Sequence, residues 1–362
     1  MEESTNFTTN STILGHCGPL HHEYQPNPLT LVLFGYVMPV LLLVTATFNA
    51  MVIAVLSREN MRTGSNIILL AISISDTLTM LFPAPFFIYM YTLGNYVYHL
   101  NPPFMCYLWD ITTLTLPTMF HTFSIWLTLA LATQRYIQIC HTPLAQIYCT
   151  NFRVGTVVVI LFILSAFYQL PLFFYVSHQT HSEIEGCLSC KADWAMSNDG
   201  TFIYLYFATR PFIVNLIPCA ILVVLNILLF RTIRRAEMTR NRLMKSIKKK
   251  ESRRSREKSN TTMMLIVIVT IFLLTEMPLG IVNPMRVFEL LNESNQIIFN
   301  TITNFMILST YPLNFGIYCG MSQQFRETFK VIILRQRPTR NAQEDQTTLT
   351  TFNSRRGSQS VL

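Results

Sequence analysis

The sequence is poor in charged residues, and those that it has are unevenly placed. Asp, Glu, Lys and Arg make up 13% of the 362 residues, against roughly 25% in an ordinary soluble protein, while hydrophobic residues make up 51%. Residues 231–260 hold 13 of the 27 basic side chains and only three acidic ones. This one block accounts for the formal charge of +8, so neither a soluble fold nor a nucleic-acid-binding surface is expected.

Catalytic and targeting motifs are also missing. The chain has no His-Glu-x-x-His motif and no phosphate-binding loop, so we expect no enzyme, no metal site and no cofactor. Residues 1–28 contain neither a basic start nor an apolar run. They therefore do not resemble a cleavable signal peptide, and the first apolar stretch is expected to act as the insertion signal.

Seven apolar stretches are each long enough for a helix to cross a hydrocarbon core of ~30 Å, which takes about 20 residues. They run over Leu29 to Leu56, Asn66 to Leu93, Phe104 to Ile139, Val154 to Ser177, Thr201 to Phe230, Thr262 to Met285 and Gln296 to Gly320. The sequence predicts an all-α membrane protein with a seven-transmembrane helix bundle. We expect an extracellular tail at 1–28, the bundle at 29–335 and a disordered cytoplasmic tail at 336–362.

Basic residues are almost absent from every second connecting segment. These segments are 1–28, 94–103, 178–200 and 287–295. They contain a single basic residue, Lys191, and because basic residues collect on the cytoplasmic side, the N-terminus is predicted to lie outside. Three glycosylation sequons lie on the same predicted outer side, at Asn6, Asn10 and Asn292.

Polar groups inside the spans are candidates for function because burying them in lipid is costly. Asp76 in the second span is expected at the depth of Asn49, Ser124 and Asn314, whose oxygen atoms suit a sodium ion or a proton-linked site. The alternative is a protonated or water-bridged carboxyl that helps the helices to pack. The sequence leaves both interpretations open.

The third span repeats polar residues at intervals of seven, which keeps them on one helix face. The two series are Asp110, Pro117, Ser124 and His121, Thr128, Arg135. We expect this face to point into the bundle. Arg135, followed by Tyr136 at the inner end, either snorkels to the interface or caps an inward-facing switch.

Several motifs in order resemble the rhodopsin-like (class A) G-protein-coupled receptors over roughly residues 29–335. They are Asn49, Asp76, Cys106 with Cys187, Gln134-Arg135-Tyr136, Pro218, Pro278 and Asn314-Phe315-Gly316-Ile317-Tyr318. The resemblance implies a plasma-membrane receptor that couples to a heterotrimeric G protein through Arg135, Tyr136 and Tyr318. It also implies a short amphipathic eighth helix around Phe325 and Phe329.

Departures from the family pattern narrow the resemblance. Gln134 replaces an acidic residue, Glu276 lies in Thr-Glu-Met-Pro where the family has a tryptophan motif, and Phe315 replaces a proline. Together with the Asn-Phe-x-x-Tyr-Cys motif, these departures resemble the sequence pattern of the invertebrate myosuppressin, sex-peptide and FMRFamide-like neuropeptide receptors. Opsins and aminergic receptors are excluded, because no lysine lies in the seventh span and Pro117 stands where aminergic receptors have an aspartate.

Four cysteines face the predicted oxidising side: Cys17, Cys106, Cys187 and Cys190. We expect a disulfide from Cys106 to Cys187 that fixes the second outer loop over the helix mouths. Cys17 then pairs with Cys190. A bridge from Cys106 to Cys190 stays an alternative, because connectivity among four cysteines does not follow from sequence.

The predicted outer segments carry nine acidic residues against Lys191, a field that attracts cationic ligands. An amidated peptide ending in Arg-Phe fits this field, although acidic loops can also serve solubility alone. The expected ligand-binding residues are Asp110, His121, Arg210, Glu276 and Arg286. Glu276 must be protonated or partnered, either by Arg210 in an internal ion pair or by the guanidinium of the peptide.

The alternative function is an ion channel or transporter, with Asp76, Arg210 and Glu276 along its pathway. The absence of an inverted repeat and the basic third inner loop argue against it. The hydroxyl-rich tail from Pro338 is predicted to recruit an arrestin-like protein when phosphorylated. Its last residues, Ser360-Val361-Leu362, fit a PDZ ligand.

Overall fold

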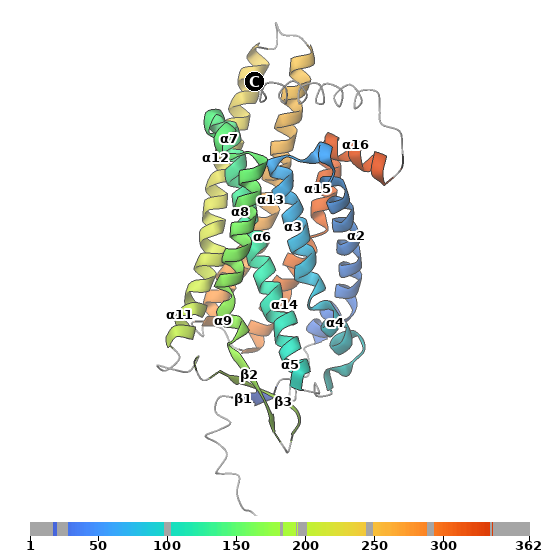
Figure 1. The fold of residues 1–362 in the computed structure, drawn as a ribbon, viewed down its shortest axis with the longest axis vertical. Coiled ribbons are helices and arrows are strands. Elements are labelled where there is room, and N and C mark those ends of the chain that lie inside the picture. Colours follow the sequence, from blue (N-terminus) through green and yellow to red (C-terminus); the bar gives the residue numbers. More distant parts are fainter. Residues whose placement is uncertain are drawn as a thin grey trace, which may run out of the picture.

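The computed structural model is a bundle of long helices with a small antiparallel sheet at one end (Figure 1). We call this end the strand end and the opposite end, where the short helix α16 lies, the α16 end. The structure describes residues 17–19, 28–97, 103–181, 184–192, 194, 201–243, 249–287, 293–333 and 335. The predicted glycosylation sites Asn6, Asn10 and Asn292 and the tail 336–362 lie outside the described residues.

Each of the first three spans consists of consecutive helical segments, including π-helical turns in the half nearer the strand end. The segments are α1 (Pro28–Thr30), η2 (Leu31–Val37) and α2 (Met38–Leu56); α3 (Gly64–Leu81), α4 (Ala84–Phe87) and η4 (Ile88–Thr92); α5 (Pro103–Asp110), η6 (Ile111–Thr115) and α6 (Leu116–Cys140). Short helices η3 (Glu59–Met61), η5 (Asn95–Val97) and α7 (Thr142–Tyr148) lie in the connections. Both ends of each span lie within two residues of the predicted ends.

The fourth span, α8 (Asn151–Tyr168), ends well before the predicted Ser177. The short helix α9 (Leu170–Phe173) follows, with Pro171 in its first turn. Because proline has no N–H, the hydrogen-bond ladder of α8 cannot run through this position. The last residues of the predicted span instead begin the strand β2 (Val176–His181). The length of the apolar stretch alone therefore predicted the wrong end for the fourth span.

The fifth and sixth spans are longer than predicted. The fifth comprises α11 (Thr201–Arg210), η8 (Pro211–Leu216) and α12 (Ile217–Leu243), and the sixth is α13 (Lys249–Val287). Both project beyond the other helices at the α16 end (Figure 1). The basic block between them is largely helical because Lys, Arg and Glu are strong helix formers even without apolar periodicity.

The seventh predicted span is broken into α14 (Glu293–Thr310) and α15 (Leu313–Met321). Pro312 lies at the break, where its ring and missing N–H interrupt a continuous helix. The described residues contain six continuous helical stretches long and apolar enough to cross a membrane, and the two halves α14 and α15 supply the seventh span.

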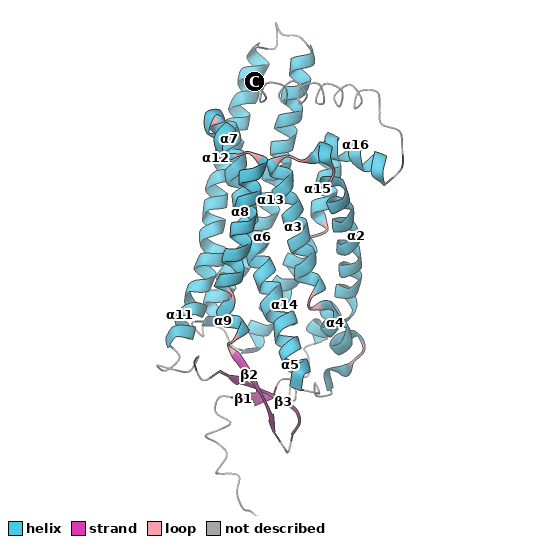
Figure 2. Cartoon of the chain, in the orientation of Figure 1, coloured by secondary structure: helices cyan, strands magenta, loops and turns pink. Residues whose placement is uncertain are grey.

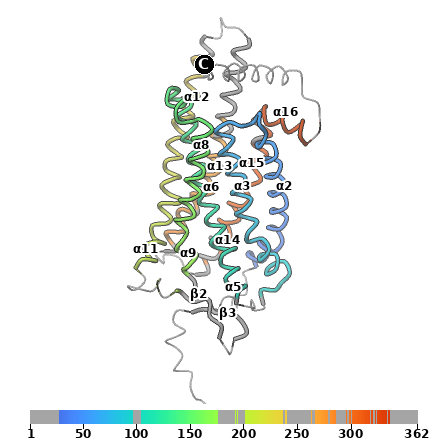
Figure 3. Tube along the Cα trace, in the orientation of Figure 1, coloured from blue at the N-terminus to red at the C-terminus, as the bar shows by residue number. Residues whose placement is uncertain are grey.

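The helix α16 (Gln323–Ile332) follows α15 at an angle and lies beside the end of α2 (Figure 3). The Ser322 hydroxyl caps it by accepting a hydrogen bond from the backbone N–H of Phe325, 3.2 Å away. Phe325 is buried against the apolar cluster formed by the first three spans. Its burial therefore joins α16 to the first span.

Three strands outside the bundle modify the all-helical prediction. The sheet order is β1 (Cys17–Pro19), β3 (Ile184–Lys191) and β2, with both pairs antiparallel (Figure 2). The hairpin of β2 and β3 packs on α5. Strand pairing satisfies the backbone groups of this segment once it leaves the helices.

Candidate functional site

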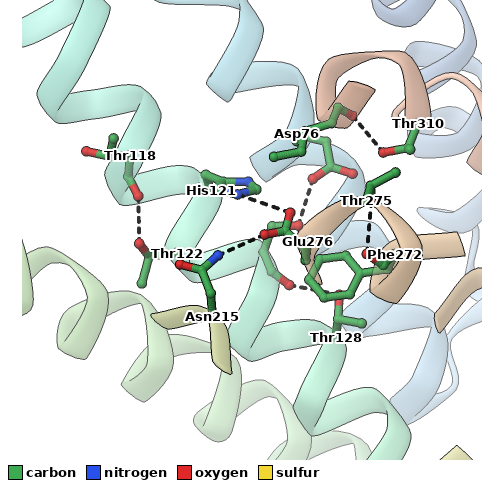
Figure 4. A network of polar contacts seen from close by, with 12 residues as sticks. Asp76, Thr118, His121, Thr122, Thr128, Asn215, Phe272, Thr275, Glu276 and Thr310 are labelled. Atoms are coloured by element: carbon green, nitrogen blue, oxygen red, sulfur yellow. Dashed lines mark hydrogen bonds and ion pairs between the residues drawn. The ribbon is translucent and has the colours of Figure 1, made fainter. Parts of the chain in front are cut away.

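A chain of polar contacts joins four spans in the middle of the bundle. The Tyr311 hydroxyl lies 3.3 Å from Nδ1 of His121, and Nε2 of His121 lies 3.2 Å from Oε1 of Glu276. The Asn215 amide donates to Oε2 of Glu276 at 2.9 Å. The contacts run from the turn after α14 through α6 and α13 to η8, and Figure 4 shows His121, Glu276 and Asn215 pointing toward one another.

The partners of Glu276 correct one prediction. Glu276 is only 1% exposed, and in the part of the chain that the structure describes its ion pair is with His121, not with Arg210. Arg210 is the last residue of α11 and is half-buried. His121 lies on the inward face of the third span, as the seven-residue spacing predicted. Its imidazole therefore contacts the carboxylate of Glu276.

Asp76 lies next to this chain on α3. It accepts hydrogen bonds from the Ser124 hydroxyl at 2.7 Å and from the Asn314 amide at 3.4 Å. The two hydrogen bonds agree with the prediction that Asp76, Ser124 and Asn314 lie at the same depth in the bundle. Asn49 is also buried, but its amide donates to the Thr77 hydroxyl at 3.0 Å instead, so among the described contacts it does not join the Asp76 group.

Asp76 and the His121–Glu276 pair line the same small cavity, of about 40 Å³. Its polar lining includes Asp76, His121, Ser124, Thr128 and Glu276. This volume is enough for a few water molecules but not for a peptide side chain as long as arginine. The interpretation of Asp76 as a sodium or water site therefore stays a prediction that the donor set and the cavity support.

A second buried polar group, absent from the sequence prediction, joins the third, fourth and fifth spans. The Gln169 side chain is fully buried; its amide donates to the Thr122 hydroxyl at 2.9 Å, and its carbonyl accepts from the Tyr206 hydroxyl at 3.0 Å. The sequence feature that could have revealed this group is the presence of polar residues within otherwise apolar stretches. Asn215, which the sequence analysis also missed, carries the same signal, but the partners of both residues depend on how the helices pack.

The predicted ligand residues do not all meet. Asp110 is the last residue of α5 and directly precedes the π-helical segment η6, while Arg286 is near the end of α13 that lies at the strand end. Asp110 and His121 are separated along the helix by about 16 Å. His121 and Glu276 thus form a deep group, and Asp110 and Arg286 lie toward the strand end. The Arg286 side chain is outside the described part.

At the α16 end, Arg135 is not held by its neighbour Gln134. Gln134 is buried and accepts a hydrogen bond from the Ser65 hydroxyl at 3.2 Å. Arg135 Nη1 donates to Gln138 at 3.3 Å, and its Nε has no hydrogen-bond partner among the described residues. Tyr136 packs against an apolar cluster of α12 and α13. Tyr318 is in α15, and its side chain is outside the described part.

Cys106 is fully buried beside Met90 and Trp109 and forms a disulfide. The backbone register of β1 and β3 places Cys17 opposite Cys190. Cys187 is in β3, but its side chain is outside the described part. The pairing of Cys106 with Cys187 therefore stays a prediction, which the packing of α5 on β3 supports.

Comparison with known proteins assigns this arrangement to a family. The model of the 7 transmembrane receptor (rhodopsin family) matches residues 48–318. The chain is 42% identical to the sex peptide receptor of Drosophila melanogaster, over 86% of this chain and 74% of that protein. It is 32% identical to sex peptide receptor-related protein 2 of Caenorhabditis elegans, over 85% and 73%.

It is also 26% identical to the FMRFamide receptor of Drosophila melanogaster, over 81% of this chain and 52% of that protein. The predicted resemblance and the seven-helix fold are thus confirmed. The family is one of receptors and not of enzymes, and its members are multi-pass proteins of the plasma membrane. The chain belongs to the rhodopsin family of seven-transmembrane receptors.

Proposed function

We propose that this receptor binds an extracellular amidated neuropeptide of the FMRFamide type and activates a heterotrimeric G protein. The observation that carries the proposal is the polar chain from Asn215 through Glu276 and His121 to Tyr311, which links four spans below the strand end. A ligand that disturbs it acts on all four spans at once. Relatives named as sex peptide and FMRFamide receptors support a peptide ligand.

The strand end faces the outside in this proposal, because the predicted outer segments carry Lys191 as their single basic residue. The same segments have nine acidic residues, so the mouth carries a net charge of −8. This field concentrates cationic peptides. An amidated C-terminus suits it because no terminal carboxylate is repelled.

The ligand residues form two levels. Asp110, Arg210 and Arg286 are nearer the mouth, and His121 and Glu276 lie at the base. Because both Glu276 oxygens already have partners, the arginine of the peptide has to displace His121 or Asn215 to reach it. A guanidinium is well suited to this exchange, since it presents several donors in a planar fork to one carboxylate.

At the α16 end we assign G-protein coupling to Arg135, Tyr136 and Tyr318. Most of the basic residues of 231–260 belong to the projecting ends of α12 and α13. The tail beyond the described residues is the proposed site for an arrestin-like protein and a PDZ domain. These partners are proposed from the sequence of the tail alone.

The proposal is tested by nucleotide exchange on a purified G protein with the receptor in lipid nanodiscs. We expect FMRFamide to accelerate exchange and the same peptide with a free carboxyl terminus to act much more weakly. A sex peptide serves as the second ligand class. Acceleration by the sex peptide alone would keep the receptor function and overturn the FMRFamide-type ligand, whereas no acceleration by either peptide with several G-protein classes would overturn the proposal.

A further inference from the structure

Gln169 lies at the break between the two helical pieces of the fourth span, after α8 and before α9. Its backbone N–H donates to the carbonyl groups of Ser165 and Ala166, and its own carbonyl accepts a hydrogen bond from the Leu172 N–H at 3.0 Å. The backbone of Gln169 is therefore bonded to both helical pieces. This fixes the point from which its side chain extends into the bundle.

The Gln169 side chain is completely buried, and both of its polar atoms have partners. Its amide donates to the Thr122 hydroxyl at 2.9 Å and to the Thr118 carbonyl at 3.5 Å. Its carbonyl accepts from the Tyr206 hydroxyl at 3.0 Å. The Thr122 hydroxyl in turn donates to the Thr118 carbonyl at 2.7 Å (Figure 4). Because buried polar groups are costly unless they are paired, this contact holds the third, fourth and fifth spans in one arrangement.

Tyr206 belongs to the face of α11 that points into the bundle. Ile203 and Tyr206 are buried, and Phe207 and Arg210 are half-buried, which is the spacing of one helix face. Arg210 follows Tyr206 by four residues, roughly 6 Å along the helix axis. A rotation of α11 that breaks the contact of Tyr206 therefore also turns Arg210 away from its place in the bundle.

The hydrogen bond to Gln169 restrains this rotation more specifically than the other contacts of Tyr206. Tyr206 otherwise packs against apolar and aromatic side chains, among them Leu172 and Tyr168. Such surfaces can slide past one another without leaving a polar group unpaired. The hydrogen bond weakens steeply when its geometry is lost, and a buried amide then stays unpaired.

Arg210 is the charged residue whose place depends on this restraint. In the part of the chain that the structure describes, Arg210 forms no ion pair. Its guanidinium has several N–H donors, which suit acceptors such as the carbonyl oxygens of a peptide. A fixed rotation of α11 therefore keeps a donor group at a defined place beside the ligand.

We propose that Gln169, acting through Tyr206, is the positioning residue that holds Arg210 toward the bound peptide, where the guanidinium donates to a carbonyl oxygen of the peptide. The inference rests on the proposed function and adds to it a fully buried residue that the ligand does not touch. Without the contact, α11 occupies several rotations, and only one of them presents Arg210 correctly. The apparent affinity then falls with the population of that rotation.

The first test measures the dissociation constant of an Arg-Phe-amide peptide on folded receptor in nanodiscs. Tyr206→Phe keeps the ring and removes the hydroxyl, and it should weaken binding about fivefold, the effect expected for one neutral hydrogen bond. Gln169→Leu should weaken binding at least as much, and the double variant no more than the larger single effect. If Gln169→Leu fails to fold, Tyr206→Phe still tests the inference.

Ser165→Ala is the matched control. Ser165 is also fully buried in the fourth span, but its hydroxyl bonds to the Phe162 carbonyl of its own helix at 2.8 Å. This variant should keep the wild-type dissociation constant. A purely structural role of Tyr206 would lower the amount of folded receptor and leave the dissociation constant of the folded fraction unchanged.

A variant of Arg210 tests whether Tyr206 acts through it. Arg210→Met should weaken binding by itself, because the guanidinium is lost. Adding Tyr206→Phe to Arg210→Met should then cost little further affinity. Losses that multiply fully would overturn the inference, since the two residues would act independently.

A second readout needs neither peptide nor G protein. Spin labels are placed on cysteines that replace Ile163 on α8 and Leu205 on α11, which are both exposed on the outside of the bundle. The cysteines that are free among the described residues are first replaced: Cys140, Cys149, Cys219 and Cys319. Tyr206→Phe should broaden the distance distribution between the labels, and Ser165→Ala should leave it unchanged.

The inference is overturned if Tyr206→Phe and Gln169→Leu keep the wild-type dissociation constant, whether or not the distance distribution broadens. An unchanged distribution would also overturn it, because α11 would then be held by other contacts. If the wild-type receptor binds no such peptide but the distribution broadens as expected, the proposed ligand and the role of Arg210 are overturned, and the restraint of α11 by Gln169 is supported.

Discussion

Gln134 precedes Arg135 in the sequence, but its side chain is engaged with the second span. It accepts a hydrogen bond from Ser65, and it packs so close to Gly64 that a Cβ there would lie 2.5 Å from its Nε2. Arg135 therefore has only Gln138 as a hydrogen-bonding partner among the described side chains. The arginine lacks the carboxylate that would restrain it by charge.

We predict measurable basal signalling in the wild-type receptor and a decrease of about twofold or more in Gln134→Glu, because a carboxylate beside Arg135 favours the restrained conformation. Arg135→Ala should abolish coupling. Basal and stimulated nucleotide exchange check both variants. An unchanged basal rate in Gln134→Glu would show that another group, such as Gln138, already holds the arginine.

Individual site residues were predictable where helix spacing alone decides their position. The intervals of seven correctly placed His121 and Ser124 inside the bundle, and Asp76 meets Ser124 and Asn314 as expected. The partner of Glu276 was not predicted: the sequence analysis considered Arg210 and the guanidinium of the peptide, and the structure shows His121. The choice depends on helix rotation and the π-helical turn η8 after Arg210, which the sequence pattern does not reveal.

At the scale of elements, the length of the apolar stretches predicted the bounds of the first three spans well. It failed where proline, strand pairing or helix propensity decides the structure. Pro171 ends the fourth span early and Pro312 divides the seventh. The strands were missed because the search for apolar stretches of membrane length does not detect short paired segments. The basic block was expected as a loop, yet its residues favour helix.

The hairpin of β2 and β3 is an element whose attachment can be tested. We predict that Cys106→Ser and Cys187→Ser each abolish surface expression or lower peptide potency strongly, because the disulfide fixes the hairpin on α5. Cys190→Ser should have the weaker effect, since Cys190 lies opposite Cys17 in the sheet. Surface labelling and potency measurements decide the pairing. Normal signalling by Cys187→Ser together with loss in Cys190→Ser would reverse it.

At the scale of the whole molecule, the bundle has an apolar exterior and an interior in which apolar clusters surround a few buried polar groups. Large apolar side chains are exposed along the outside of the first, fourth and fifth spans, as expected for a surface that faces lipid. Inside, the chain of Tyr311, His121, Glu276 and Asn215 links the spans halfway between the mouth and the α16 end. Among the described residues, this polar chain lies between the proposed peptide site near the strand end and the proposed G-protein site at the α16 end.

A cycle of receptor and peptide changes measures whether the arginine of an amidated peptide acts on Glu276. Potency is compared for wild type and Glu276→Gln, each with an Arg-Phe-amide peptide and with its citrulline analogue, and Thr275→Val serves as control. We predict that Glu276→Gln lowers potency at least tenfold, about 1.4 kcal/mol, and that citrulline costs little further in that variant. Fully additive losses would contradict the account, because the carboxylate and the ligand arginine would then act independently.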